Sequence, residues 1–118
     1  MKIRIKNNSV RYRLTQSDVA ALIEKGYLED SVDFGTQKFV YAIDINAGEQ
    51  LAASYTNNTV TLLMPQFMIE ELANTDKVGF SGESGEVHLL VEKDFTCLDN
   101  VAEDQSDNYP NPLAEKTL

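Results

Sequence analysis

The chain has little cysteine, glycine or proline, and each scarcity limits the class of protein or the kind of site that the chain can form. Its single cysteine, Cys97, excludes an internal disulfide and a zinc cluster built from cysteines. Six glycines and three prolines in 118 residues, with 25% charged residues, are typical of a folded globular protein. No apolar run approaches the roughly 20 residues of a membrane-spanning helix, and no apolar region follows the charged start MKIRIK. We therefore expect one soluble, cytoplasmic domain with no signal peptide.

Basic residues are also few, and they are unevenly placed. The chain has 10 basic and 19 acidic residues, for a net charge of −9. Five of the ten basic residues lie among the first thirteen positions, which contain no acidic residue. The rest of the chain then carries a net charge of −14, because it holds the other five basic residues and all nineteen acidic ones. The protein is therefore electrically polarised along its sequence.

Two segments fifty positions apart match without a gap, IKNNSVRYRLTQSDVAAL (5–22) and YTNNTVTLLMPQFMIEEL (55–72). The identical pairs are Asn7/Asn57, Asn8/Asn58, Val10/Val60, Gln16/Gln66 and Leu22/Leu72. We interpret this match as a tandem duplication. The copies differ in charge, because Thr56, Thr61 and Leu63 stand in the second copy where the first has Lys6, Arg11 and Arg13.

Each copy opens with alternating apolar and polar residues, the period-two pattern of half-buried strands. Segments 2–6 and 9–14 flank Asn7-Asn8, which suits a two-residue turn with positive φ. The second copy predicts the same hairpin around Asn57-Asn58. In the first hairpin the register would oppose Lys2 to Arg13 and Arg4 to Arg11 on one face, with the apolar residues on the other.

A short helix is expected after each hairpin. In the first copy Thr15 is a candidate N-cap, with Asp18 at the third helical position and Gly26 placed to end the helix. In the second copy the helix would start at Pro65 and end near Asn74. The residues expected to face the core are Val19, Leu22 and Ile23 in the first helix and Met68, Ile69 and Leu72 in the second.

A further hairpin is expected after each helix, formed by 31–34 with 38–45 and by 78–80 with 87–95, the latter joined by a glycine-rich loop at 81–85. The predicted fold is α+β: an antiparallel eight-stranded sheet or barrel built from a tandem ββαββ duplication, with two helices covering one side. The predicted organisation is a single domain, 1–95, made of pseudo-repeats 1–46 and 51–95. An acidic, proline-containing tail, 96–118, follows it.

The first hairpin gathers five cations that the second copy folds without. We name Lys2, Arg4, Lys6, Arg11 and Arg13 the basic cluster. Directly opposed like charges cost some fraction of about 1 kcal/mol per pair, so a negative group is expected nearby. One candidate is a phosphate, polyphosphate or carboxylate ligand, to which arginine offers bidentate hydrogen bonds. The other is the chain's own acids, either Glu92 and Asp94 or the acidic tail folded across the cluster as a lid.

The sequence gives less support for other partners and for cofactors. Nucleic acid is disfavoured, because the rest of the chain would repel its backbone and no aromatic residues alternate with the cations as a stacking platform. Glu92 and Asp94 are weak candidates for holding a divalent metal, or for acid and base catalysis, since they are two positions apart on one strand. An ordinary solvated strand face is the preferred interpretation of these two carboxylates. No cofactor is expected, and the oligomeric state is not indicated.

The ends of the chain carry a family resemblance. The start KIRIKNNSVRYRLT, and LVEKDFTCL followed by an acidic stretch and Tyr-Pro-Asn-Pro, resemble a family of short uncharacterised bacterial proteins. The resemblance spans nearly the whole chain. It implies no activity and no catalytic residue.

The sequence favours a small non-catalytic binding or interaction module that uses the basic cluster to bind an anionic ligand or its own acidic tail. The alternative is a metal-dependent phosphohydrolase acting on a polyphosphate-type anion inside a barrel. Such a barrel, with inward cations and a few metal-holding carboxylates, is similar to the triphosphate-tunnel phosphohydrolases. Those proteins begin with alternating glutamates, whereas this chain begins Lys-Ile-Arg-Ile-Lys.

Overall fold

The fold consists of two four-stranded sheets and two helices. It was obtained as a computed structural model, in which residues 1–96 and 105–112 are described. The first half contains β1 (Lys2–Lys6), β2 (Ser9–Leu14), α1 (Gln16–Lys25), β3 (Tyr27–Asp33) and β4 (Lys38–Asn46). The second half contains β5 (Ala52–Thr56), β6 (Thr59–Pro65), α2 (Gln66–Asn74), β7 (Gly79–Ser84) and β8 (Val87–Lys93).

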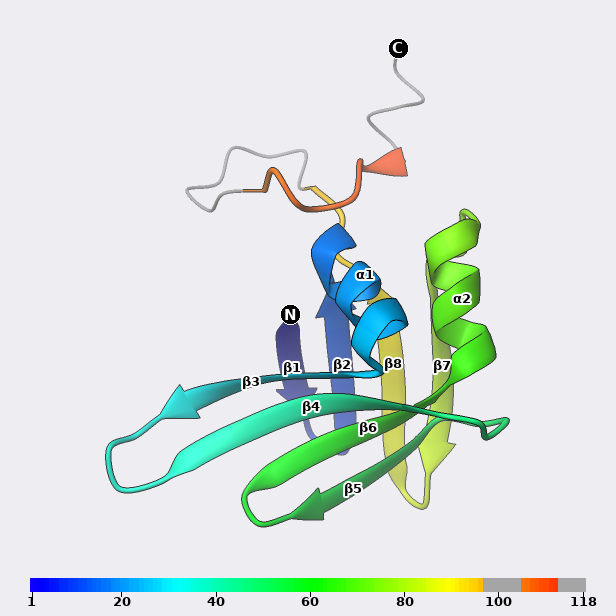
Figure 1. Ribbon diagram of the computed structural model, residues 1–118. Helices are drawn as coiled ribbons and strands as arrows, with labels where there is room; N and C mark the ends of the chain where they lie inside the picture. Colours follow the sequence, from blue (N-terminus) through cyan, green and yellow to red (C-terminus); the bar gives the residue numbers. More distant parts are fainter. Residues whose placement is uncertain (97–104, 113–118) are drawn as a thin grey trace.

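Each sheet combines one hairpin from each half of the chain. Sheet A has the strand order β1-β2-β8-β7, and sheet B has the order β3-β4-β6-β5. The outer pairs of each sheet are antiparallel hairpins, whereas the central pairs β2–β8 and β4–β6 are parallel. Figure 1 shows sheet B crossing in front of sheet A, with α1 and α2 beside it over the remaining part of sheet A. The described residues therefore form two stacked layers.

The expectation of one antiparallel sheet or barrel was wrong. All four predicted hairpins form, but they join through parallel central strands, and neither sheet closes into a barrel. The period-two pattern identifies strands and short turns identify their partners within a hairpin. Neither signal contains information on how separate hairpins combine, because that pairing depends on contacts between residues far apart in the chain.

The element order ββαββ occurs twice, as the internal match predicts. Replacing each element by its counterpart in the other half converts the strand order of sheet A into that of sheet B. Equivalent backbone hydrogen bonds recur, since the His88 N–H donates to Asn8 O and the Val40 N–H donates to Asn58 O. The two halves are thus topologically equivalent. Their origin by duplication stays a prediction.

The turn signals predicted for hairpins β1–β2 and β5–β6, and the signals predicted for the ends of both helices, are confirmed. Asn7, Asn57 and Asn58 have positive φ, as the two-residue turns require. Thr15 caps α1 in a capping box with Asp18, and Gly26 ends the helix in the left-handed conformation. The second helix has Pro65 at its N-cap and ends at Asn74.

Several boundaries and one core residue were predicted wrongly. Strand β3 begins at Tyr27, four residues before the predicted start, and the loop expected at 81–85 is largely the end of β7. The turn there is formed by Gly85 and Glu86. Ile23, expected in the core, is 47% exposed, because α1 packs through its Val19 and Leu22 face.

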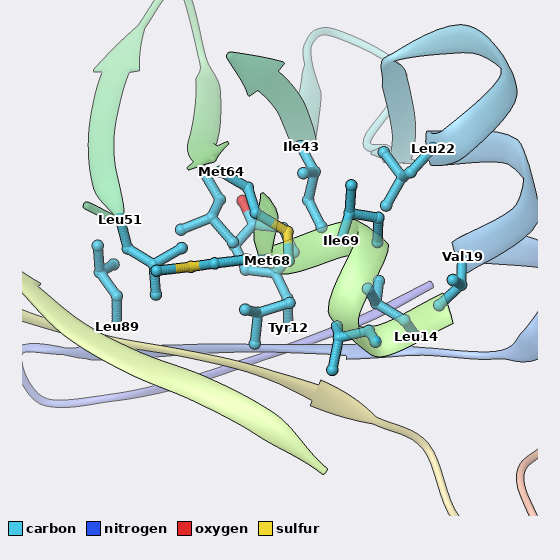
Figure 2. Packing of buried hydrophobic residues seen from close by; sticks show 13 residues of the cluster. Tyr12, Leu14, Val19, Leu22, Ile43, Leu51, Met64, Met68, Ile69 and Leu89 are labelled. Atoms are coloured by element: carbon cyan, nitrogen blue, oxygen red, sulfur yellow. The ribbon is translucent and has the colours of Figure 1, made fainter. Parts of the chain in front are cut away.

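The core lies between the two sheets and under the two helices. Figure 2 shows side chains from both sheets and both helices converging there, among them Tyr12, Met64, Met68 and Leu89. Tyr12 also joins the layers by a hydrogen bond, because its hydroxyl donates to Val60 O at 3.1 Å. Burial raises the pKa of this hydroxyl well above its ordinary value, so it remains protonated and able to donate.

The segment 105–112 packs against the end of β8 and the start of α1. The Tyr109 N–H donates to Asp94 O, and the Thr96 N–H donates to Tyr109 O, both at 2.8 Å. The Tyr109 ring meets Phe95 edge-on, with ring centres 6.1 Å apart. This part of the predicted tail is therefore held by backbone hydrogen bonds and aromatic packing. Among the helices of the described residues, none is long and apolar enough to span a membrane.

Candidate functional site

The basic cluster lies on the outer face of sheet A, as the hairpin register predicts. Lys2 is paired with Arg13 and Arg4 with Arg11 in the β1–β2 hairpin. The opposite face of β2 carries Tyr12 and Leu14, which are buried in the core. Strand β8 continues the rows of side chains on this face, because Arg13 is paired with Glu92, Arg11 with Leu90 and Ser9 with His88.

Glu92 lies beside the two arginines of β2. Its Oε1 atom is 3.2 Å from Arg13 Nε and 3.7 Å from Arg11 Nε. The arginine side chains are 37–39% exposed, and that of Glu92 is 21% exposed. One carboxylate thus faces two guanidinium groups, and solvent reduces the stabilisation that each contact provides.

Asp94 neutralises the other end of the cluster. Its Oδ2 atom is 3.1 Å from Lys2 Nζ, and its side chain is only 6% exposed. The alignment at Oδ2 does not meet hydrogen-bond geometry, so this contact is mainly electrostatic. Glu92 and Asp94 therefore lie close enough to neutralise charge on Lys2, Arg11 and Arg13. This is what one of the two alternatives drawn from the sequence expected.

Arg4 and Lys6 differ from the other three cations. Within the described part of the chain neither has an acidic group within salt-bridge distance. Both are exposed, and with Ser9 and Arg11 they line a surface hollow of about 200 Å³. As far as the described residues go, this is where the positive charge of the outer face is least compensated.

A larger groove adjoins this hollow and shares Ser9 and Arg11 with it. It has a volume of about 540 Å³ and runs across β8 to β7. Leu90 lies in its floor, and Glu83 and His88 lie at the β7 side, where Glu83 Oε1 is 3.2 Å from His88 Nδ1. The sequence predicted that β7 pairs with β8, but it placed Glu83 in the connecting loop and gave no sign that β2 lies on the other side of β8.

Sequence reasoning missed the structural role of Lys93. Its side chain points to the core side of sheet A and the residue is only 7% exposed. The Nζ group donates to Thr75 O, at the end of α2, at 2.9 Å and lies 4.9 Å from the centre of the Tyr109 ring. A buried ammonium needs such partners. Lys93 therefore connects α2 to the segment 105–112, although no local pattern distinguishes it from a surface lysine.

One alternative drawn from the sequence placed the acidic tail across the basic cluster. In the described segment, Asp107 instead binds the start of α1, where the Ser17 N–H and hydroxyl donate to its carboxylate. These hydrogen bonds, first that of the Ser17 side chain, lower the pKa of Asp107. The other acidic residues of the predicted tail, Asp99, Glu103, Asp104 and Glu115, lie outside the described residues.

The geometry removes the basis of the phosphohydrolase alternative. That alternative needs cations directed into a barrel, but the sheets do not form a barrel and the basic cluster lies on an exposed outer face. Glu92 and Asp94 contact cations instead of facing them across a cavity. In residues 1–96 and 105–112, no group of three or more histidine, cysteine, aspartate or glutamate residues is arranged to hold a metal ion.

Comparison with known proteins places the chain in a family. Residues 1–113 match the family described as "Family of unknown function (DUF7009)". The chain belongs to this family. No curated protein and no solved structure matches the chain. The two ends of the sequence predicted membership of an uncharacterised family, and this prediction is confirmed. The bacterial origin of the family and the motifs proposed for it stay predictions.

Proposed function

We propose that this protein is a non-catalytic binding module that takes an anionic ligand, bearing phosphate or carboxylate, on the outer face of sheet A. Arg4, Lys6 and Arg11 would bind the anion, with the Ser9 hydroxyl as a further donor. The observation that carries the proposal is the positive charge around the hollow that these four residues line, where Arg4 and Lys6 have no acidic group of residues 1–96 and 105–112 within salt-bridge distance.

Charge balance on this face supports the proposal. Lys2 and Arg13 have close carboxylates in Asp94 and Glu92, and Arg11 shares Glu92 at the longer distance of 3.7 Å. Arg4 stands directly opposite Arg11, so the two guanidinium groups repel each other across the hairpin. A bound anion would relieve this repulsion and accept charge-assisted hydrogen bonds from both arginines.

The second half of the chain provides an internal comparison. Ser54 and Thr61 are the paired residues of the β5–β6 hairpin that correspond to Arg4 and Arg11. That hairpin forms with a two-residue Asn-Asn turn at the same place and with the same pairing, without any cation at these positions. Folding therefore does not require the charges, which favours a role in binding.

The test is a thermal-shift and calorimetric titration with inorganic phosphate, pyrophosphate and triphosphate at constant ionic strength. A ligand at 100 times its dissociation constant should add about 2.7 kcal/mol to the free energy of unfolding. The double variant Arg4→Gln/Lys6→Gln should bind at least about tenfold more weakly, a loss of about 1.4 kcal/mol.

The matched control is Lys25→Gln/Lys38→Gln, which removes the same charge from exposed positions on α1 and β4. This control should bind like the parent protein. Equal weakening in both double variants would show a general effect of net charge and would contradict the site. Failure of all three anions to bind the parent protein would contradict an oxyanion ligand.

A further inference from the structure

The groove beside the anion site is shaped by small residues on β7. Its lining on that strand consists of the small residues Ser81 and Gly82 together with Glu83. On the outer face, the strand pairing places Gly79 beside Glu92 and Ser81 beside Leu90. A Cβ atom at Gly79 would lie 2.5 Å from Val91 O, so β7 approaches β8 more closely there than any larger residue would allow.

Sheet B carries larger residues at the equivalent positions. Tyr27 and Glu29 of β3 pair with Asp44 and Ala42, just as Gly79 and Ser81 pair with Glu92 and Leu90. The same topology thus carries two different outer faces. The open face occurs on the sheet that also carries the basic cluster, so the groove and the anion site lie side by side.

The groove is chemically different at its two sides. At the β2 side stands the guanidinium of Arg11, and at the β7 side stands the carboxylate of Glu83, whose side chain is 65% exposed. Strand β8 lies between them, with half-buried Leu90 paired with Arg11 and Ser81, and His88 paired with Ser9 and Glu83. The Nδ1 atom of His88 is 3.2 Å from Glu83 Oε1. Strands β2 and β7 are separated by β8, so two interstrand spacings, about 10 Å, separate the two sides.

We infer that the ligand is a nucleoside monophosphate carrying an exocyclic amino group on its base. Its phosphate binds at Arg4, Lys6 and Arg11, which rests on the proposed function. Its planar base lies over the apolar side chain of Leu90 on the outer face of sheet A. The amino group of the base donates to Glu83, which accepts hydrogen bonds but cannot donate them when ionised.

The experiment compares four ligands by isothermal calorimetry on the full chain. Adenosine 5′-monophosphate should bind at least about tenfold more tightly than inorganic phosphate or ribose 5-phosphate. It should also bind more tightly than inosine 5′-monophosphate, which lacks the amino group. Glu83→Gln should remove the preference for the adenine nucleotide over the hypoxanthine nucleotide, because the amide presents one acceptor oxygen and a competing donor.

Two variants test the groove separately from the anion site. Ser81→Tyr fills the groove, and Leu90→Ala removes its floor by copying Ala42 of sheet B. Each variant should abolish the higher affinity for adenosine 5′-monophosphate over inorganic phosphate. The affinity for inorganic phosphate itself should not change. The control Glu29→Tyr places the same side chain at the equivalent position of sheet B and should change neither affinity.

The outcomes separate this inference from the proposed function. Equal affinity of the parent protein for inorganic phosphate and adenosine 5′-monophosphate would overturn the inference and leave the anion site standing. Binding of neither would overturn both. If both groove variants still bound adenosine 5′-monophosphate more tightly than inorganic phosphate, the base would lie elsewhere, and this result would also overturn the inference.

Discussion

At the scale of a single residue, Asp107 holds the segment 105–112 against the first turn of α1. Its carboxylate accepts hydrogen bonds from the Ser17 N–H and hydroxyl, and its backbone carbonyl accepts one from the Gln16 N–H. These donors belong to the helix N-terminus, where negative charge is favoured. The ionised form of Asp107 is thus the form that binds.

The substitution Asp107→Asn should lower the free energy of unfolding by an amount that depends on pH. The pKa of Asp107 is lowered below its ordinary value of 3.8, chiefly by the hydrogen bond from the Ser17 side chain. The carboxylate therefore stabilises the fold fully above about pH 4, and this stabilisation is lost as pH falls through the lowered pKa.

Urea midpoints of the parent protein and Asp107→Asn, measured from pH 7 to pH 2.5, test this prediction. The midpoints should differ by a constant amount above about pH 4 and converge below it. The double variant Asp107→Asn/Ser17→Ala is the control, and its pH-dependent difference from Ser17→Ala should be smaller than that between Asp107→Asn and the parent protein, because only the Ser17 hydroxyl is lost while the Ser17 N–H still donates. A gap that persists at the lowest pH would contradict the assignment.

At the scale of the element, the pairing of β7 with β8 determines the shape of the outer face of sheet A. Strand β8 is central in this sheet, parallel to β2 and antiparallel to β7. It brings Glu92 to the basic cluster on one face and Val91 to the core on the other. Any change that displaces β7 from β8 should therefore alter both stability and the groove.

The substitution Gly79→Ala should destabilise the protein by about 1–3 kcal/mol, the usual cost of forcing an extra methyl group into a packed position. Its Cβ would lie 2.5 Å from Val91 O and 2.8 Å from Glu92 Cβ, so the strands must separate. Chemical denaturation measures the change. Ser81→Ala in the same strand is the control and should change stability by less than about 0.5 kcal/mol. Equal stability of Gly79→Ala and the parent protein would contradict the close approach.

At the scale of the whole molecule, the two halves of the chain are interlocked. Hairpin β1–β2 belongs to the same sheet as β7–β8, and β3–β4 to the same sheet as β5–β6. The core cluster likewise contains residues of both halves, including Tyr12 and Leu22 from the first and Met64 and Leu72 from the second. Neither half contains a complete sheet or a complete core.

Fragments divided in the exposed β4–β5 connection should therefore be unfolded alone and fold when mixed. Fragment 1–48 lacks the parallel partners of β2 and β4, which are β8 and β6. Its two hairpins belong to different sheets, and an isolated two-stranded hairpin is at best marginally stable in water. Circular dichroism of each fragment and of the equimolar mixture measures the effect, with the intact chain as reference. A cooperative thermal transition in fragment 1–48 alone would contradict the interlocked arrangement.

Much of the local structure could be predicted because its causes lie within a few residues. Positive φ at Asn57 and Asn58, the capping box of Thr15 and Asp18, and the helix end at Gly26 each depend on nearest neighbours. The register of the first hairpin follows from its turn and its alternation, so the opposition of Arg4 to Arg11 was also predictable. The charges of the candidate site were therefore visible in the sequence.

By itself, the sequence determined the hairpins, the helices and the gathering of five cations on one hairpin face, because these depend on turn chemistry, capping and side-chain periodicity. Only the tertiary structure decided that β8 lies parallel to β2, that Glu92 faces Arg11 and Arg13, and that a groove runs from Arg11 to Glu83. Those contacts join residues about eighty positions apart. They are set by which hairpins share a sheet when both halves bury a common core, and no local pattern encodes that choice.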